Sequence, residues 1–270
     1  MTRTSFNLFA QRYFSTLLSE FGTVYLNEPV PRDPKLRVYK LPSRNNVGTQ
    51  ILGAVTQRND RIMISPEVIG EAELVDVLFE PDEQKARTEL GLLGELLSVP
   101  CIIETLRWLP TVREVRTCMR HWLSWKVGAT GGMIPVDQDA VDREIEEEED
   151  IDDKLLLIVL PSTTPTLLET WGASPDSRNV PGVYQLAPAF CTMIVVVSEL
   201  PQDTSTLWLR LLGRGRTQRL AIQELMRLEL RHPIREAVLH QFKQWYELMI
   251  QGQMGKESKL CLQVLSQIES

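Results

Sequence analysis

The run from Glu71 to Phe79, Glu-Ala-Glu-Leu-Val-Asp-Val-Leu-Phe, places one aspartate inside an otherwise apolar stretch. The apolar residues have the composition of a buried central strand, and Asp76 interrupts them. A carboxylate in apolar surroundings is costly unless it is paired, hydrogen-bonded or bound to a cation. We therefore expect either that the strand opens to solvent at Asp76 or that Asp76 has a functional role, and that the rest of the chain packs around this strand.

A second strand is expected at Leu155–Leu160, which is apolar throughout. Continuous apolar runs of this length are typical of strands that are covered on both faces, as in an α/β layer. Apolar residues at spacings of three and four predict helices at Ser5–Phe21 and Thr111–Lys126. We predict that Glu73–Phe79 and Leu155–Leu160 lie in one central mixed sheet and that these two helices flank it.

Turn residues and periodicity suggest how the rest of the chain is organised. Helices are also predicted at Glu83–Leu97, from a cap at Thr217 to Leu228, and from Pro233 onward, and Thr111 is a capping candidate because Glu114 follows three residues later. The predicted class is α/β, with a helical C-terminal lobe. The predicted units are an α/β half at 1–135 with a β-rich insertion around 36–59, an acidic linker at 136–153, the remaining α/β core at 154–200, and the helical lobe at 201–270.

Charge is distributed unevenly along the chain. Eleven acids and a single base, Arg143, lie between Asp137 and Asp153, although the formal net charge of the whole chain is only -7. Such a block is typical of a solvated linker. It can also imitate nucleic acid and screen a basic surface, and it is a candidate contact for a protein partner, as is the C-terminal lobe.

The C-terminal part of the chain is basic. Between Leu207 and Lys243 there are eight basic residues and three glutamates. This excess predicts either an electrostatic footprint for the phosphates of DNA or a solvated helical face. The candidate nucleic-acid-binding residues are Arg210, Arg214, Arg216 and Arg219.

Several other classes of site lack their sequence signals. The four cysteines are far apart and no CxxC motif occurs, so we expect reduced core thiols rather than a zinc site or disulfides. There is no Gly-x-Ser-x-Gly elbow and no phosphate-binding Gly-Lys-Thr/Ser loop. No apolar run approaches the length of a membrane span, and the first residues lack a signal-peptide core. We therefore predict a cytoplasmic protein with no membrane association.

Three stretches resemble those of cyanobacterial proteins of unknown function that are related to recombination-promoting nucleases and putative transposases. These stretches are Arg61–Glu67 with Glu71–Phe79, Leu90–Gly94 with Pro100–Glu104, and Leu207–Gln218 with Ala221–Leu225. The wider group is similar to the PD-(D/E)XK nuclease fold, the restriction-endonuclease-like αβββαβ core. The resemblance implies that Asp76 is the metal-binding aspartate and that residues 36–59 are an insertion.

The nuclease pattern also requires a second acid, with a lysine two residues later, on the next strand. The two carboxylates hold Mg²⁺, and the lysine orients or activates the attacking water. Glu104 is the candidate for the second acid, but Leu106 stands where the lysine is expected, and Arg107 is the only nearby substitute. The candidate catalytic residues are thus Asp76, Glu104 and Arg107, with Asp76 and Glu104 as Mg²⁺ ligands if the site is intact.

Two functional hypotheses follow. The first is a nuclease-like, nucleic-acid-associated protein with a degenerate or unusual PD-(D/E)XK-type site. The second is a non-enzymatic interaction or assembly protein that uses the α/β core as a scaffold. The distance between the carboxylates of Asp76 and Glu104 distinguishes them, because only converging carboxylates can share a metal ion.

Overall fold

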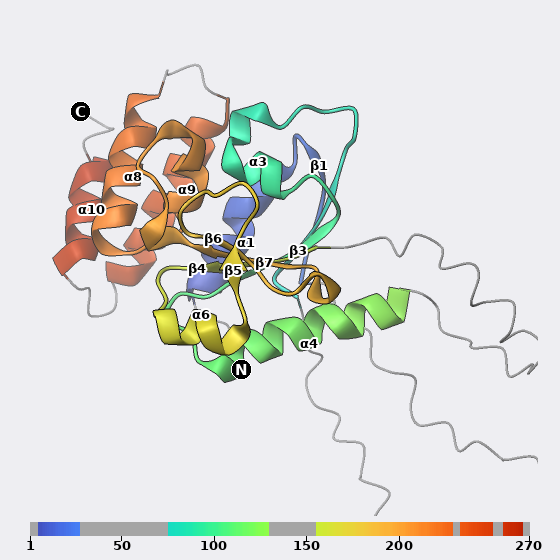
Figure 1. Cartoon of the computed structure of the whole chain (residues 1–270). Helices are drawn as coiled ribbons and strands as arrows, with labels where there is room; N and C mark the ends of the chain where they lie inside the picture. Colours follow the sequence, from blue (N-terminus) through green and yellow to red (C-terminus); the bar gives the residue numbers. More distant parts are fainter. Residues whose placement is uncertain (1–4, 28–74, 130–154, 229–232, 251–255, 267–270) are drawn as a thin grey trace, which may run out of the picture.

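The computed structural model describes residues 5–27, 75–129, 155–228, 233–250 and 256–266, which form a three-layer α/β/α arrangement (Figure 1). The strands of these residues form one mixed sheet in the order β1-β2-β3-β4-β7-β6-β5. The strands are β1 (Gly22–Leu26), β2 (Val77–Pro81), β3 (Cys101–Thr105), β4 (Leu155–Leu160), β5 (Ser174–Pro175), β6 (Val183–Gln185) and β7 (Thr192–Val196). The predicted insertion at 36–59 and the predicted acidic linker lie outside the described residues.

The helices precede, separate and follow these strands. Those of the first half are α1 (Ser5–Leu18), the short 3₁₀ helix η1 (Thr88–Leu90), α3 (Leu92–Leu96), α4 (Val112–Ala129) and α6 (Pro165–Trp171). Those of the second half are η2 (Pro188–Phe190), η3 (Val197–Glu199), η4 (Thr204–Thr206), α7 (Leu207–Arg210), α8 (Gly215–Arg227), α9 (Pro233–Ile250) and α10 (Lys256–Ser266). None of the described helices is long and apolar enough to cross a membrane.

The sheet has a parallel centre and antiparallel edges. β2 runs antiparallel to both of its neighbours, β1 and β3, whereas β3, β4 and β7 run parallel to one another. β6 and β5 then extend the sheet as short antiparallel strands. The structure confirms the predicted α/β class and mixed sheet, and it confirms that the strand containing Val77–Phe79 and the strand Leu155–Leu160 share one sheet.

Both faces of the central strands are covered by helices, as the apolar runs predicted. Side chains alternate along each strand, so Val77, Ile103 and Leu157 face the core that contains α1 and the C-terminal helices. Leu78 and Ile102 face the opposite core, which contains the buried side of α4. Figure 1 shows α4 on the side of the sheet away from α1 and α9. The predicted flanking of the sheet by these two helices is therefore confirmed.

Aromatic side chains join the N-terminal helix to the C-terminal helices. The ring of Phe9 on α1 stacks on Trp245 of α9 with centroids 4.5 Å apart, and it lies 4.8 Å from the ring of Phe242. Tyr13 donates a hydrogen bond of 2.7 Å from its buried hydroxyl to the carbonyl oxygen of Trp208. The helices that end the chain thus share one apolar core with the helix that begins it.

Two predicted helix boundaries are wrong. The helix expected at Glu83–Leu97 is reduced to η1 and α3, because Gly91 between them has a φ of +53° and no room for a side chain. A Cβ at Gly91 would lie 2.3 Å from the carbonyl oxygen of Ser205. Further on, α8 begins at Gly215 and is preceded by Arg214, whose side chain makes no capping hydrogen bond, so Thr217 is not the cap.

The capping box predicted at the start of α4 is present. The backbone N–H of Glu114 donates to Thr111 Oγ1 at 3.3 Å, and the carboxylate of Glu114 accepts from the backbone N–H of Thr111 at 2.8 Å. This reciprocal pair satisfies two N–H groups that the helix itself leaves without partners.

We predict that Thr111→Ala lowers the free energy of unfolding by about 1 kcal/mol, as is typical for loss of an N-cap side chain. Denaturation by urea, followed by circular dichroism, measures the change. Thr117→Ala is the matched control, because its hydroxyl only donates to the carbonyl oxygen of Arg113 inside the same helix. An equal loss in both variants would contradict a specific role for the cap.

Candidate functional site

The polar residues of interest gather at one edge of the sheet. The carboxyl ends of the parallel strands β3, β4 and β7 meet at this edge, and the antiparallel β2 begins there. Asp76 directly precedes β2, and Glu104 is the penultimate residue of β3. Both side chains are buried, each with 6% of its residue surface exposed. The carboxyl edge of an open α/β sheet is where such folds usually bind ligands.

Asp76 and Glu104 lie near each other at this edge. The antiparallel register pairs Val77 of β2 with Ile103 of β3, and Asp76 and Glu104 are the residues next to this pair. Asp76 lies in a bend before β2, and its neighbours Val75 and Val77 belong to opposite cores, so the regular alternation of the strand does not extend to it. Glu104 follows Ile102 by two residues and so faces α4, as Ile102 does.

Helices on both sides of the sheet contribute a hydrogen-bond partner to this pair. His121 of α4 has its Nδ1 atom 3.1 Å from Oε1 of Glu104. Gln11 of α1, which is 2% exposed, donates from Nε2 to Oδ1 of Asp76 at 3.3 Å. These contacts fix the orientation of each carboxylate. The contact with His121 becomes an ion pair when the imidazole is protonated.

The negative charge of the pair acts on Cys118 of α4. Burial raises the pKa of this thiol well above its ordinary value, and the charges of Glu104 and Asp76 raise it further. Both carboxylates are therefore close enough to one thiol to disfavour its anion. Cys118 is accordingly a buried, reduced thiol in apolar surroundings, and the four free cysteines agree with the expectation of reduced residues.

Asn27 adds a neutral oxygen beside Asp76. It directly follows β1 in the left-handed conformation, with a φ of 60°, and its backbone N–H donates to the carbonyl oxygen of Asp76 at 3.5 Å. Asparagine tolerates this conformation better than most residues do. Its side-chain Oδ1 is buried and has no hydrogen-bond partner among the described residues. Its backbone thus adjoins that of Asp76, and its amide oxygen is a candidate metal ligand in this part of the fold.

This donor set suits a hard divalent cation. Mg²⁺ binds carboxylate and carbonyl oxygens and is commonly held by one or two carboxylates, with water and substrate phosphates completing its shell. In the described part of the chain, no group of three or more His, Cys, Asp and Glu side chains is placed to hold a metal ion. The two carboxylates, with Asn27 beside them, fit an open Mg²⁺ site and do not fit a closed structural one.

Arg107 does not join the carboxylates. Its guanidinium lies over the rings of Phe6 and Trp245, at 4.7 and 4.9 Å from their centroids, and it donates to the carbonyl oxygen of Gly213 at 2.8 Å. Burial lowers the pKa of Arg107 to about 10. This arginine is held by α1, α9 and the loop before α8, so the structure does not place it as a substitute for the missing lysine.

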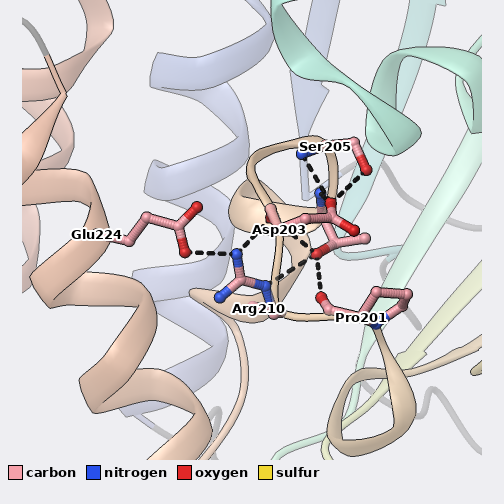
Figure 2. Close-up of polar contacts among 6 residues, drawn as sticks. Pro201, Asp203, Ser205, Arg210 and Glu224 are labelled. Carbon is pink, nitrogen blue, oxygen red and sulfur yellow. Dashed lines mark hydrogen bonds and ion pairs between the residues drawn. The ribbon is translucent and has the colours of Figure 1, made fainter.

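Arg210 does not belong to a nucleic-acid surface. Only 1% of it is exposed, and Figure 2 shows its guanidinium enclosed between Glu224 and the loop that contains Asp203. It pairs with the carboxylate of Glu224 at 2.7 Å and donates to Thr206 Oγ1 at 2.9 Å and to the carbonyl oxygen of Asp203. The prediction that Arg210 contacts phosphate is therefore wrong, because the guanidinium ties α7 to α8.

The remaining predicted arginines differ from one another. Arg214 and Arg216 are exposed at the start of α8, whereas Arg219 is partly buried on the same helix. The guanidinium carbon of Arg214 lies 3.7 Å above the ring centroid of Trp108. Of the four predicted arginines, Arg214 and Arg216 are thus the ones exposed enough to contact a ligand from solution.

Three residues of the site were not singled out from the sequence. His121 carries a weak signal, since it follows Cys118 by three residues on an amphipathic helix. Gln11 lies within an aromatic stripe, and Asn27 ends a strand that no motif marks. Their roles depend on contacts between segments far apart in the chain.

No protein-family model matches the chain, and comparison with curated proteins and with solved structures finds no significant match.

We predict that Arg210→Ala lowers the free energy of unfolding by about 3 kcal/mol, because it leaves the carboxylate of Glu224 without the guanidinium with which it pairs. Arg216→Ala is the matched control from the same segment and should change stability by no more than about 0.5 kcal/mol, as expected for an exposed side chain. Denaturant unfolding of both variants measures the difference. Equal stabilities would contradict the structural role of Arg210.

Proposed function

We propose that the chain is a nuclease-like, nucleic-acid-associated protein with an unusual PD-(D/E)XK-type site at Asp76 and Glu104. The observation that carries the proposal is the position of two buried carboxylates, each next to the paired residues Val77 and Ile103, at the carboxyl edge of the sheet. A buried pair of like charges is unfavourable for folding unless something compensates it. A divalent cation and the phosphate it binds would provide that compensation.

The order of elements supports this proposal. Among the described residues, the first elements are α1, β1, β2 and β3, followed by α4 and by β4 parallel to β3, with η1 and the short α3 between β2 and β3. This is the αβββαβ order of the restriction-endonuclease-like core that the sequence resemblance implies. Asp76, directly before β2, and Glu104, on β3, are the residues to which the resemblance assigns the two acids.

The residues of the chain have distinct roles in the proposed site. Asp76 and Glu104 would hold Mg²⁺, with Asn27 as a further oxygen donor beside them. When bound, the ion would neutralise charge on a phosphoryl oxygen and lower the pKa of a water molecule. Gln11 and His121 orient the two carboxylates through the hydrogen bonds described above. Leu106 occupies the place of the usual lysine, so this chain differs from the nuclease pattern in how the attacking water would be positioned.

We predict that Asp76→Asn and Glu104→Gln each weaken Mg²⁺ or Mn²⁺ binding by more than about 100-fold, beyond the loss typical for residues that only support a ligand. Calorimetric titration of the full chain with the metal alone measures this affinity. Cleavage of labelled single-stranded and duplex substrates should disappear in the same variants. Glu80→Gln is the control, because Glu80 lies on the same strand but at its other end.

Metal binding that is equally strong in the wild type and in both variants would contradict the site. Metal binding without cleavage of any DNA or RNA would remove the hydrolytic part of the proposal and leave a metal-binding protein.

One observation favours the second candidate, a non-enzymatic protein that uses the α/β core as a scaffold. Both carboxylates already have hydrogen-bond partners in helices that cover the sheet, and Arg107 and Arg210 are occupied in structural contacts. In this case Asp76 and Glu104 would serve to fix α1 and α4 to the sheet.

Stability measured in the presence of EDTA separates the two candidates. If the carboxylates are retained for a ligand, Asp76→Asn and Glu104→Gln should leave the free energy of unfolding unchanged or raise it, because each removes one of two repelling charges. If they are structural, each variant should lose about 1–3 kcal/mol, as expected when a buried hydrogen-bond partner is removed. In a parallel measurement without EDTA, metal at 100 times its Kd should raise the free energy of unfolding of the wild type by about 2.7 kcal/mol in the first case only.

A further inference from the structure

An exposed tryptophan lies next to the proposed site. Trp108 follows β3 and leaves 62% of its surface exposed, and its neighbour Leu109 is 49% exposed. The guanidinium of Arg214 lies 3.7 Å above the Trp108 ring. This exposure leaves the indole ring accessible to a ligand that stacks on it from solution. This Trp108–Arg214 pair presents an aromatic ring and a positive charge together.

The pair is held in place by the core below it. Arg107, which precedes Trp108, is fixed over Phe6 and Trp245 and donates to the carbonyl oxygen of Gly213, which precedes Arg214. One hydrogen bond therefore ties together the two loops that carry the pair. A ring held in this way requires little ordering when a ligand binds, and this favours affinity.

Two further exposed arginines follow the members of the pair along the chain. Arg216 is exposed in the first turn of α8, and Arg113 is exposed in the first turn of α4, five residues after Trp108. Two acids lie near Trp108 and Arg113 in sequence: Glu104 is buried against His121, and Glu114 has its carboxylate engaged in the capping box with Thr111. The surface defined by Trp108, Arg214, Arg216 and Arg113 is thus aromatic and basic, which is the combination that proteins use to bind single-stranded nucleic acid.

We propose that this surface binds a single-stranded segment of nucleic acid, with an unpaired base stacked on Trp108 and the backbone phosphates on Arg216 and Arg113. In a duplex the faces of the bases are covered by their neighbours, so the face of an aromatic ring can stack only on an unpaired or terminal base. The proposal deepens the function proposed above, on which it rests, by naming single strands as the substrate class.

The surface also lies within reach of the carboxylates. Trp108 is four residues from Glu104, and a fully extended chain of that length spans at most about 14 Å. A strand stacked on Trp108 would therefore pass within a few nucleotides of Asp76 and Glu104. Substrate binding and the proposed metal site would then act on the same strand.

The test measures binding of fluorescein-labelled oligo(dT) and of a duplex of equal length to the full chain by anisotropy, with metal removed by EDTA. We expect single strands to bind more tightly than duplex, and Trp108→Ala to weaken single-strand binding about 10-fold or more. Trp108→Phe should retain most of the affinity, because it keeps an aromatic face. Leu109→Ala is the matched control from the same exposed loop and should bind as wild type does.

Salt dependence tests the phosphate contacts. Arg216→Ala and Arg113→Ala should each reduce the slope of log affinity against log salt by about 0.7 on single strands. Trp108→Ala should leave that slope unchanged, because stacking releases no counterions. Unchanged slopes in both arginine variants would overturn the assignment of the phosphate contacts.

Three results would overturn the proposal. One is unchanged affinity for oligo(dT) in Trp108→Ala while that variant retains the wild-type unfolding midpoint, and another is a preference for duplex in the wild type. The third is binding of an acidic peptide, such as residues 137–153 of this chain, with the same dependence on Trp108 but no binding of oligo(dT). Stacking on Trp108 together with cleavage that persists in Asp76→Asn would support this surface and overturn only the proposed catalytic site.

Discussion

Cover on both faces of the central strands is the constraint on which the rest of this structure depends. β4 is apolar along its whole length, and β3 and β7 are apolar except at Glu104, Thr105 and Thr192. Each fully buried Leu, Ile or Val contributes about 1.5–3 kcal/mol relative to exposure. This contribution is obtained only if one layer of helices lies on each side. The side with α1 also recruits the C-terminal helices, through Phe9, Phe242 and Trp245. The other side is covered by α4.

The same double cover explains how two carboxylates come to be buried. Asp76 and Glu104 lie where β2 begins and β3 ends, so they are at the edge of the apolar layers yet beneath the helices. Each is compensated by a polar group from a different helix, Gln11 from α1 and His121 from α4. The helices that exclude water from the core therefore also supply the hydrogen-bond partners that reduce the cost of burying the carboxylates. The same contacts are expected for a ligand-binding site and for polar groups that attach α1 and α4 to the sheet. Variants of both acids distinguish these two roles.

The arginines illustrate how similar residues acquire different roles. Arg107 is enclosed by aromatic rings, Arg210 is buried against Glu224, and Arg214 lies over an exposed ring. The planar guanidinium can stack and donate in several directions at once, so it serves equally as a structural connector and as a ligand contact. Charge counted along the sequence does not separate these uses. The eight basic residues of the C-terminal part include Arg210, which is buried and which no ligand can reach.

Local patterns in the sequence were sufficient for the features that depend on near neighbours. The periodicity of Ser5–Phe21, the apolar run Leu155–Leu160 and the spacing of Thr111 and Glu114 each act over a few residues, and the structure confirms a helix, a central strand and a capping box there. Asp76 is also marked by a local feature, since it is a charged residue within an apolar run. Tertiary structure decided the rest: His121 reaches Glu104 from another element, Gly91 breaks a helix because the Ser205 backbone approaches it, and Arg210 is buried because α7 packs on α8. Such contacts join residues that are far apart in the chain, so no local pattern encodes them.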